Sequence, residues 1–537
     1  MTKVNPEKLA LTDILGQRIE SLADLEKAKR LSAKKYHIPT VLNSTILREY
    51  RHLLSLGRRR DERLERLLRK RTIRTLSGIA PVAVLTKVYP CPGRCAYCPN
   101  EKDVPVSYLA NEPAVMRAIR CQYDPYKQVT MRLYALENNG HEPTKIEIIV
   151  IGGTWSYLPE RYKFWYILNC FRAANDYPNN KNNPKLKSLK APFGQNLALS
   201  ELKKRLLIEQ KKNEKAVYKI IGLTLETRPD YINDKELKEM RILGCTRVEM
   251  GVQAIDDRIL RLNQRGHGVA EIIAATKLLK SYGFKITYHI MPALPGSTPA
   301  KDLKMFKELF SSESYQPDQI KFYPTIVTAG TLLYRWYRQG KYKPYTDKQL
   351  QGLIVRCKES VPEYVRIIRL IRDIPGESII AGNLITNLRQ VMKDKGVKCN
   401  CIRCREAKDS KFSKTDFFIK VNSYKASGGQ EYFISAVSRD GRILYGFCRL
   451  RLDASSRVAP ALIRELHVYG ELVSVGAKKK TQHSGLGKEL MKNAEAIVKQ
   501  NKIKKMAVIS GVGVRDYYRK LGYKLKDSYL VKQIKSY

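Results

Sequence analysis

The feature that most limits the fold of this chain is an alternation of short apolar runs with helix-length stretches between residues 80 and 371. The runs are rich in β-branched residues, which favour strands. They occupy residues 82–88, 147–153, 220–227, 247–253, 285–292 and 319–325, with a seventh candidate at 365–371. Strands that alternate with helices form right-handed βαβ crossovers and a parallel sheet. We therefore expect an α/β multidomain chain built around a partial (β/α)6 barrel, with its chemistry at the C-terminal strand ends.

The regions that flank this centre differ from it in pattern. We predict a basic helical region over residues 1–75, the barrel domain over 76–392, a charged linker over 393–412 and a separate α+β unit over 413–537. The last unit should contain strands at 432–437, 444–452, 462–469 and 506–510 and a helix over 489–500. Within the barrel, the Asn/Lys-rich residues 175–215 indicate a surface insertion.

The charge balance favours a polyanionic partner. The 537 residues carry 99 Lys and Arg against 52 Asp and Glu, a formal net charge of +47. Such a surplus repels itself unless an anion neutralises it, and nucleic acid is the leading candidate. Residues 58–74 carry nine basic side chains against three acidic ones, which favours a phosphate-contacting surface over a solvated helix face. Without a membrane-length apolar run or a signal-like start, the sequence predicts a cytoplasmic protein that does not insert into membranes.

Six of the eleven cysteines lie in two tight clusters, and the first cluster directly follows the first predicted strand. Its members Cys91, Cys95 and Cys98 have the spacing C-x3-C-x2-C. Three thiolates cannot complete a tetrahedral zinc site alone, but they can bind three irons of a 4Fe–4S cluster and leave the fourth open. An open iron can bind S-adenosylmethionine and pass an electron to its sulfonium. The alternative is a zinc site that a remote ligand completes.

The spacing and position of these cysteines resemble the radical S-adenosylmethionine (SAM) superfamily, whose cores are six-stranded partial β/α barrels. The likeness extends to strand-end segments that contain Gly152, Gly153, Glu226, Gln253 and Arg265. It implies that the glycine backbone approaches the amino group of SAM, that Glu226 and Gln253 bind its ribose and amino-acid portions, and that Arg265 binds its carboxylate. Taken singly, each of these residues also suits an ordinary turn or strand end.

The C-terminal unit contains a glycine-containing loop, Gln482-His-Ser-Gly485-Leu-Gly487-Lys488, just before its predicted helix. Such a loop turns free backbone N–H groups and the positive end of the helix dipole toward an anion, and a pyrophosphate fits. Alone, it is equally consistent with a capped turn. The order of this loop, the upstream strand around His467 and the downstream Tyr517-Tyr518 pair resembles the GNAT acetyltransferase fold. That resemblance implies coenzyme A at the loop and one of the tyrosines beside the thioester sulfur, whereas the alternative is a tyrosine pair that only packs in the core.

The two domains together resemble the family of Elongator catalytic subunits, which are tRNA acetyltransferases that act on the wobble uridine. Segments that carry the match are residues 74–80, 112–120, 123–126, 226–231, 244–253, 464–470 and 510–519. The resemblance implies binding of acetyl-CoA and a tRNA anticodon stem-loop, and transfer of a carboxymethyl group to carbon 5 of the uridine through a 5′-deoxyadenosyl radical. Catalytic roles are implied for Lys145, His467, Tyr517 and Tyr518. Implied contacts of acetyl-CoA are Lys145, Glu465, Leu466, His467, Val468, Gln482, Gly485, Leu486, Gly487, Lys488 and Tyr518.

The second cluster, Cys399, Cys401 and Cys404, departs from part of that family, in which only the position of Cys399 is a cysteine. The spacing C-x-C-x2-C in a linker favours a structural zinc (Zn²⁺) site over a second iron–sulfur cluster or free thiols. A fourth ligand is needed, and Cys357 and His289 are the candidates.

Two other functions stay open on the sequence. The C-terminal unit alone suits a protein-lysine acetyltransferase, and a tRNA-binding scaffold with a decayed radical site would need no chemistry. The charge of +47 argues against Lys-rich substrates, and the retained Cys91, Cys95, Cys98 and Arg265 argue against a scaffold. We also expect an external electron donor for the cluster, and the lack of obvious partner-docking extensions favours an enzyme that acts alone.

Overall fold

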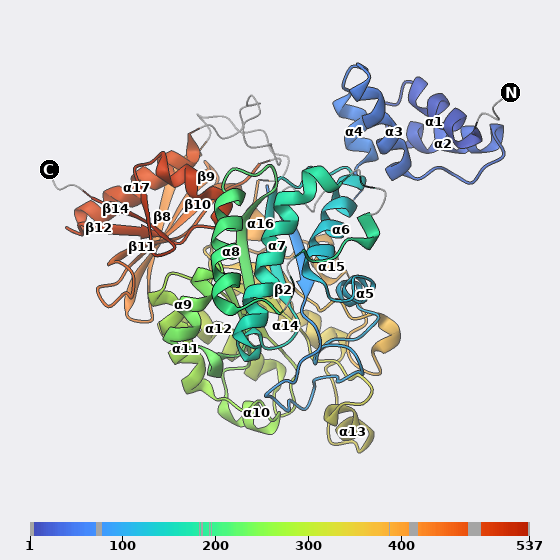
Figure 1. Ribbon diagram of the computed structural model, residues 1–537. Coiled ribbons are helices and arrows are strands. Elements are labelled where there is room, and N and C mark those ends of the chain that lie inside the picture. The colour runs from blue at the N-terminus through green and yellow to red at the C-terminus, as the bar shows by residue number, and fades with distance from the viewer. Residues whose placement is uncertain are drawn as a thin grey trace.

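The computed structural model describes residues 5–70, 78–385, 387–407, 417–470 and 485–534, apart from residues 182, 184, 185, 193 and 195. These residues form a small helical module, a parallel sheet surrounded by helices, and a second, mixed sheet (Figure 1). In Figure 1 the helical module projects at the upper right, the parallel sheet is central and the mixed sheet packs at the left.

The central sheet has seven parallel strands in the order β1-β2-β3-β4-β5-β6-β7. Their bounds are β1 (Ala80–Leu85), β2 (Lys145–Ile151), β3 (Lys219–Thr227), β4 (Arg247–Gln253), β5 (Lys285–Ile290), β6 (Gln319–Phe322) and β7 (Arg366–Arg369). Each strand pairs with its neighbour in parallel, so all carboxyl ends meet at one edge. Since β1 and β7 are the two ends of the strand order, the barrel is open. This confirms the predicted partial β/α barrel, and the seventh candidate strand is part of it.

Helices cover the outside of this sheet, as buried parallel strands require. They are α5 (Pro113–Arg120), α6 (Pro125–Asn138), α7 (Glu160–Asn180), α8 (Leu199–Asn213), α9 (Asp234–Ile242), α10 (Asp257–Leu262), α11 (Val269–Ser281), α12 (Pro299–Ser311), α13 (Leu332–Arg338), α14 (Asp347–Ser360), α15 (Leu388–Asp394) and α16 (Ile402–Arg405). No helix among the described residues has the length and apolar character needed to cross a lipid bilayer.

The prediction of a surface insertion over residues 175–215 is wrong for most of that segment. The end of α7 occupies its start, and α8 occupies its second half. Leu202 and Leu206 of α8 are fully buried, and Asn213 donates from Nδ2 to the carbonyl of Tyr218 just before β3. The two leucines lie four residues apart, on one helix face, but the Asn/Lys-rich composition around them concealed this pattern.

The N-terminal module has a hydrophobic core of its own, which includes Ile14, Leu25, Ile46 and Tyr50. Among the described residues its helices are α1 (Pro6–Gly16), α2 (Leu22–Lys35), α3 (Asn43–Ser55) and α4 (Glu62–Leu68). It is attached to the barrel at the C-terminal end of α6. There Arg51 donates to the carbonyl of Glu137 at 2.9 Å and Arg69 to that of Gly140 at 3.1 Å. Cations are favourable at this position because the helix dipole is negative there.

The second sheet has the order β13-β14-β12-β11-β10-β9-β8. Its strands are β8 (Phe417–Ala426), β9 (Gly429–Ser438), β10 (Leu444–Leu452), β11 (Ala461–Val468), β12 (Lys505–Val508), β13 (Lys524–Lys526) and β14 (Tyr529–Gln533), and its helices are α17 (Leu486–Gln500) and α18 (Arg515–Arg519). The parallel pair β11 and β12 is in register only from Ala461 to Ile463. β12 ends at Val508, opposite Ile463, and among the described residues the rest of this edge of β11 has no strand partner.

Buried ions join the two sheets. Arg464 of β11 donates to Asp318 before β6, with Nη1 3.0 Å from Oδ1, and to Glu431 of β9 at 2.9 Å. All three side chains are almost completely buried. Close backbone packing adds to this contact, because a Cβ at Gly511 would lie 1.9 Å from the carbonyl oxygen of Ile221 on β3. Paired charges and an interlocked backbone thus fix one sheet on the other.

The predicted domain boundaries remain a proposal. Those at 75/76 and 412/413 fall on residues outside the described ranges. The boundary at 392/393 falls inside α15, so the predicted linker would begin within a helix.

Candidate active site

A cavity of about 1120 Å³ runs through the open barrel to the second sheet. At the carboxyl edge of the strands its wall includes Cys91, Cys95 and Cys98. At the opposite end its wall includes Arg449 of β10 with Glu465 and His467 of β11. The first cysteine cluster and strand β11 therefore border one continuous space, although more than 350 residues separate them in sequence.

The first cysteine cluster occupies the loop after β1. Cys95 is buried, and Arg265 donates from Nη1 to its Sγ at 3.2 Å. A hydrogen bond from Cys98 and the positive charge of Arg265 lower the pKa of Cys95 to about 4. Cys95 is therefore a thiolate at neutral pH, the form that binds metal.

The three sulfur atoms of this cluster do not all lie within 4.8 Å of one another. Zinc–sulfur bonds of about 2.3 Å require ligand sulfurs within about 4.6 Å of each other. Among the described residues, only the second cysteine cluster brings three ligand atoms within 4.8 Å of one another. The spacing favours separate irons of a cluster over a single zinc ion.

Gly153, Glu226, Gln253 and Arg265 of the predicted SAM site all line the cavity. The two adjacent glycines serve different purposes. A Cβ at Gly152 would lie 2.3 Å from Oγ1 of Thr86, so this glycine permits close packing between β2 and the end of β1. A Cβ at Gly153 would meet no atom within 4 Å, so Gly153 is the one whose backbone is open to a ligand. The cofactor contacts themselves remain predictions.

Glu226 and Gln253 have the properties of ligand-binding side chains. Glu226 accepts a hydrogen bond from the hydroxyl of Tyr108 at 3.1 Å and lies 3.6 Å from Nδ1 of His289. Gln253 has a φ of 71°, unusual for a residue with a side chain, and its buried Oε1 has no hydrogen-bond partner among the described residues. Leaving a buried polar atom unsatisfied costs about 1–3 kcal/mol. A positive φ and an unused acceptor at a cavity wall are properties expected of a ligand-binding residue, and the contact itself remains a prediction.

A group of charged side chains inside the barrel was missed by the sequence analysis. Glu249 on β4 is fully buried, lies 2.9 Å from Nε2 of His289 and forms a close ion pair with Lys321 on β6. Burial alone would raise the pKa of Glu249, but Lys321 and His289 hold it well below its usual value. The sequence did contain a signal for this group. Arg247, Glu249 and Gln253 are separated by even numbers of residues along one strand, and such side chains lie on the same face, here the inward one.

At the other end of the cavity, Glu465 is held by two cations from different domains. Its Oε1 lies 3.2 Å from Nζ of Lys285 on β5, and its Oε2 accepts from Nε of Arg449 at 3.0 Å. Burial alone would raise the pKa of Glu465, but Lys285 and Arg449 lower it to about 2. Glu465 is therefore ionised at neutral pH and can accept hydrogen bonds but donate none. His467 lies beside it, with its ring stacked on Phe447 at 5.8 Å between centroids.

The predicted acetyl-CoA contacts are divided between the two faces of β11. Glu465 and His467 line the cavity, whereas Val468 lies on the other face, toward the start of α17. A Cβ at Gly487 would lie 2.7 Å from the hydroxyl of Tyr517, and this hydroxyl is buried without a partner among the described residues. Tyr517 thus directs its hydroxyl at α17, and Tyr518 is largely buried beside it. A ligand that contacts both faces must lie along the edge of β11 beyond Ile463, where β12 has ended and no other described strand pairs with β11.

The loop before α17 is described only in part, because Gln482 lies outside the described residues. Gly485 has a φ of 107° and precedes Leu486, Gly487 and Lys488, the first residues of α17. Among the described residues no side-chain hydrogen bond caps this helix start, which is the condition for anion binding there.

Lys145 is the first residue of β2. It shares the inward face of this strand with Glu147 and Ile149, which line the cavity. Burial lowers its pKa. The neighbouring strand is preceded by Gly78, whose Cβ would lie 3.3 Å from the carbonyl oxygen of Gly470 after β11. The structure thus places Lys145 at the junction of the two domains, and its contact with acetyl-CoA remains a prediction.

The second cysteine cluster lies against β7. The Sγ atoms of Cys399, Cys401 and Cys404 are within 4.8 Å of one another, and the amide of Ile402 donates to the carbonyl of Val365 at 2.9 Å. The sequence did not identify a fourth ligand, and the structure supports neither of the two candidates, Cys357 and His289. Neither belongs to this group, because His289 is committed to Glu249 inside the barrel and Cys357 is buried on α14. Three thiols leave one position of a tetrahedral zinc open.

The basic side chains of the N-terminal module have different roles. Arg58 donates to the carbonyl of Leu15 at 2.5 Å, and Arg60 pairs with Glu65 at 2.9 Å. These two arginines hold the module together. Arg59 and Arg66 are exposed and have no ion-pair partner among the described residues, so they are the ones available to an anionic partner.

Comparisons with known proteins agree with this geometry. The radical SAM superfamily model matches residues 89–309, the radical SAM C-terminal domain model residues 317–395 and the acetyltransferase (GNAT) family model residues 402–523. The tRNA uridine(34) acetyltransferase of Dehalococcoides mccartyi (strain CBDB1) is 39% identical over 87% of this chain and 100% of its own. Elongator complex protein 3 of Homo sapiens is 35% identical over 98% of this chain and 97% of its own. The structure of the archaeal Methanocaldococcus infernus Elp3 with an N-terminal deletion (1–46) aligns with a TM-score of 0.70 and 36% identity, over 85% of this chain and 99% of that chain.

Fold and site together define a radical SAM enzyme joined to a GNAT acetyltransferase domain. The chain belongs to the family that contains the tRNA uridine(34) acetyltransferases and Elongator complex protein 3, which confirms the predicted resemblance. The radical SAM domain implies a 4Fe–4S cluster and SAM, and the GNAT domain implies acetyl-CoA.

Proposed function

We propose that this protein is a tRNA uridine acetyltransferase that installs a carboxymethyl group at carbon 5 of the wobble uridine. The observation that carries the proposal is the shared cavity, whose wall includes both the Cys91–Cys98 loop and strand β11. Radical chemistry and acetyl-CoA binding need a common space only if the acetyl group itself is the group that reacts. A protein-lysine acetyltransferase would need neither the cysteine loop nor the barrel.

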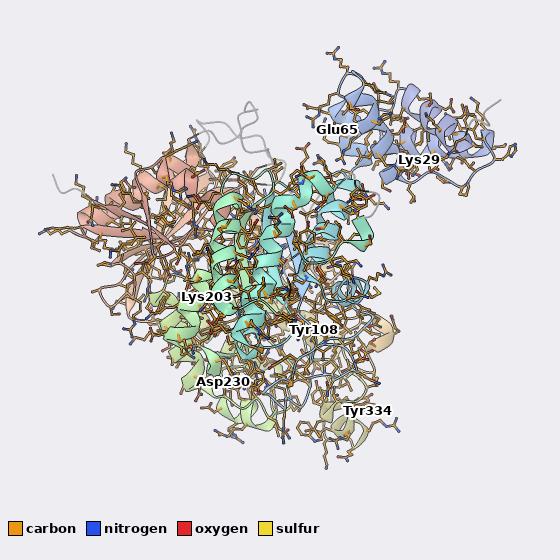
Figure 2. All side chains as sticks on the ribbon, viewed as in Figure 1. Lys29, Glu65, Tyr108, Lys203, Asp230 and Tyr334 are labelled. Atoms are coloured by element: carbon orange, nitrogen blue, oxygen red, sulfur yellow. The ribbon has the colours of Figure 1, made fainter. Side chains whose placement is uncertain are left out.

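The residues at the carboxyl edge fit the implied cofactors. Cys91, Cys95 and Cys98 would hold a 4Fe–4S cluster, and Gln253 offers SAM an acceptor that the protein leaves unused. When bound, the two cofactors supply a radical able to remove a hydrogen atom from the acetyl methyl group. Arg265 keeps Cys95 ionised, and the hydroxyl of Tyr108 orients Glu226. Figure 2 labels Tyr108 and Asp230, which lie on the side of the barrel away from the N-terminal module.

The residues at the other end fit acetyl-CoA. The free N–H groups of Gly485, Leu486, Gly487 and Lys488 would bind the pyrophosphate, and the free edge of β11 at Glu465, Leu466, His467 and Val468 would run beside the pantetheine. The hydroxyl of Tyr517 has no hydrogen-bond partner in the described part of the chain, which supports a role at the thioester. Because Glu465 stays ionised at neutral pH, its part is to accept hydrogen bonds. Lys145, His467, Tyr517 and Tyr518 are the catalytic residues of this proposal.

The substrate we assign is the anticodon stem-loop of tRNA. Arg366, Arg369, Arg372, Arg389 and Arg403 line the cavity, and the net charge of +47 suits a polyanion. A guanidinium-rich wall attracts phosphates. The exposed Arg59 and Arg66 add positive charge on the N-terminal module. A cytoplasmic location, an external electron donor and action without further subunits are also part of the proposal.

We assign a structural zinc ion to Cys399, Cys401 and Cys404. Their mutual approach supports it, as does the low pKa of Cys401, which hydrogen bonds from Cys399 and Cys404 hold well below its usual value. Metal analysis of the purified chain should find one zinc per chain, and the Cys401→Ser variant should lack it. Zinc retained in full by that variant would overturn the assignment.

The proposed reaction is tested by product analysis. The anaerobically reconstituted protein is incubated with SAM, a low-potential reductant, acetyl-CoA and tRNA, and the tRNA nucleosides are then analysed by mass. The intact chain should form 5-carboxymethyluridine, and Cys95→Ala should form none while still binding tRNA. Cys121→Ala, which removes a buried thiol at the end of α5 that does not line the cavity, is the matched control and should remain active. Unchanged product in Cys95→Ala, or acetylation of lysine peptides in place of tRNA, would contradict the proposal.

A further inference from the structure

Arg228, in the loop after β3, is a buried cation beside the cysteine loop for which the proposed mechanism gives no role. Its side chain is 6% exposed. Nε donates to Asp230 at 3.0 Å, and Nη2 donates to Asp230 and to the carbonyl of Arg265, both at 2.8 Å. The remaining nitrogen, Nη1, is buried and has no hydrogen-bond partner among the described residues. Two nitrogens therefore fix the guanidinium, and the third is left free.

The free nitrogen faces the cysteine loop. A Cβ at Gly93, midway between Cys91 and Cys95, would lie 2.3 Å from Nη1 of Arg228 and 3.5 Å from Sγ of Cys95. Any side chain at position 93 would thus displace the guanidinium. Arg228 also lines the cavity together with the three cluster cysteines.

An unused buried donor is expensive, particularly on a charged group. The ligand that would satisfy it must be an acceptor located at the cysteine loop. Thiolate and sulfide sulfurs of an iron–sulfur cluster are such acceptors, and hydrogen bonds to these sulfurs are among the factors that set a cluster's reduction potential.

We infer that Arg228 is a positioning residue for the iron–sulfur site, and that its Nη1 donates a hydrogen bond to a sulfur of the bound cluster and raises the cluster's reduction potential. The inference rests on the proposed function, because it presupposes a cluster held by Cys91, Cys95 and Cys98. Reduction of the cluster adds one electron from the external donor, and no bond in the protein forms or breaks. Since reduction adds negative charge, a nearby guanidinium favours the reduced state. Asp230, which holds Arg228, has the opposite electrostatic effect.

The test compares midpoint potentials in the reconstituted holoprotein. Iron and sulfide content are measured first, and EPR-monitored redox titration then gives the midpoint. At the applied potential at which the cluster of the intact protein is half reduced, the ratio of reduced to oxidised cluster in Arg228→Met should be about tenfold lower. This corresponds to a midpoint about 59 mV lower for a one-electron reduction. Asp230→Asn should shift the midpoint in the opposite direction. Arg172→Met, which removes an arginine paired with Asp176 and Glu209 on outer helices, is the control and should leave the midpoint unchanged.

Opposite shifts in the two variants would support the inference, because a purely structural role gives no reason for opposite signs. Arg228→Met with normal iron content and an unchanged midpoint would overturn it. If Arg228→Met loses its cluster, Asp230→Asn decides, and an unchanged midpoint in that variant would equally overturn it. If the intact protein binds no cluster, the proposed function fails as well, and the two failures are therefore distinguishable.

Discussion

Lys285, the first residue of barrel strand β5, places its Nζ 3.2 Å from Oε1 of Glu465 on strand β11 of the acetyltransferase domain. Both residues line the shared cavity. The contact between the two domains is therefore also part of the cavity wall, at the end proposed for acetyl-CoA. A change in how the domains sit together would alter that end of the cavity directly.

Acidification should weaken this junction. The pKa of Glu465 is lowered from 4.5 to about 2, because Lys285 and Arg449 outweigh the opposing effect of burial. A carboxyl group with a depressed pKa stabilises the folded state fully above about pH 4.5, and this contribution is lost as the pH falls toward about 2. The midpoint of urea unfolding should therefore fall between about pH 5 and about pH 3. Glu465→Gln should be less stable at neutral pH and should lose less over that interval. Equal losses in the two proteins would contradict the assignment.

Asp318→Asn should loosen the two domains from each other. Asp318 is completely buried, accepts from Arg464 at 3.0 Å and lies 3.5 Å from Nη1 of Arg449. Removing one partner of a buried ion pair typically costs about 3–5 kcal/mol, because it leaves uncompensated charge in the interior. A lower midpoint of urea unfolding is expected. Glu20→Gln, which breaks an exposed pair with Arg18, is the control and should change little. Equal stability of the two variants would show that the junction does not depend on this ion pair.

Gly487→Ala should weaken acetyl-CoA binding selectively. Gly487 lies within α17, where alanine is conformationally allowed, but its Cβ would lie 2.7 Å from the hydroxyl of Tyr517. Tyr517 must then move, and we expect roughly tenfold lower acetyl-CoA affinity, about 1.4 kcal/mol, with normal tRNA affinity. Calorimetric titration measures both. Gly352→Ala, on α14 with no atom near its Cβ, is the matched control. The site is misplaced if Gly487→Ala binds acetyl-CoA as tightly as this control does.

Charge reversal at Arg59 and Arg66 should weaken tRNA binding and reduce its dependence on salt. Each lost phosphate contact lowers the slope of log affinity against log salt by about one. The control is the double charge reversal of Lys524 and Lys526, which changes the net charge equally on exposed residues of β13, in the acetyltransferase domain. An unchanged slope in the double variant would remove these residues from the tRNA interface.

The barrel strands were predictable because buried parallel strands are continuous apolar runs, and Arg247–Gln253 was predicted with its observed bounds. Strand β8 was not predicted, since it is a sheet edge whose exposed positions include Ser423 and Lys425. Helix α8 was mistaken for an insertion because lysines surround its two buried leucines. Composition misleads where an element buries only a narrow stripe of residues.

The site was predictable where a local motif carried it. Cys91 follows β1, Glu226 lies near the end of β3 and Gln253 is the last residue of β4, and parallel topology brings these strand ends to one edge. The roles of Glu249 and Arg228 depend on partners such as Lys321 and Gly93, which are remote in sequence and show no local signal. For the same reason the sequence could not identify the fourth zinc ligand, since spacing alone does not show that the candidate His289 is hydrogen-bonded to Glu249.

The central claim is that one cavity serves acetyl-CoA and tRNA together. Its most direct test is the rate of acetyl-CoA hydrolysis by the purified chain, measured with tRNA, with lysine peptides and with neither. The account predicts that tRNA stimulates release of coenzyme A and that lysine peptides do not. A rate that is indifferent to tRNA but stimulated by lysine peptides would contradict it, and would identify the C-terminal domain as an ordinary amine acetyltransferase.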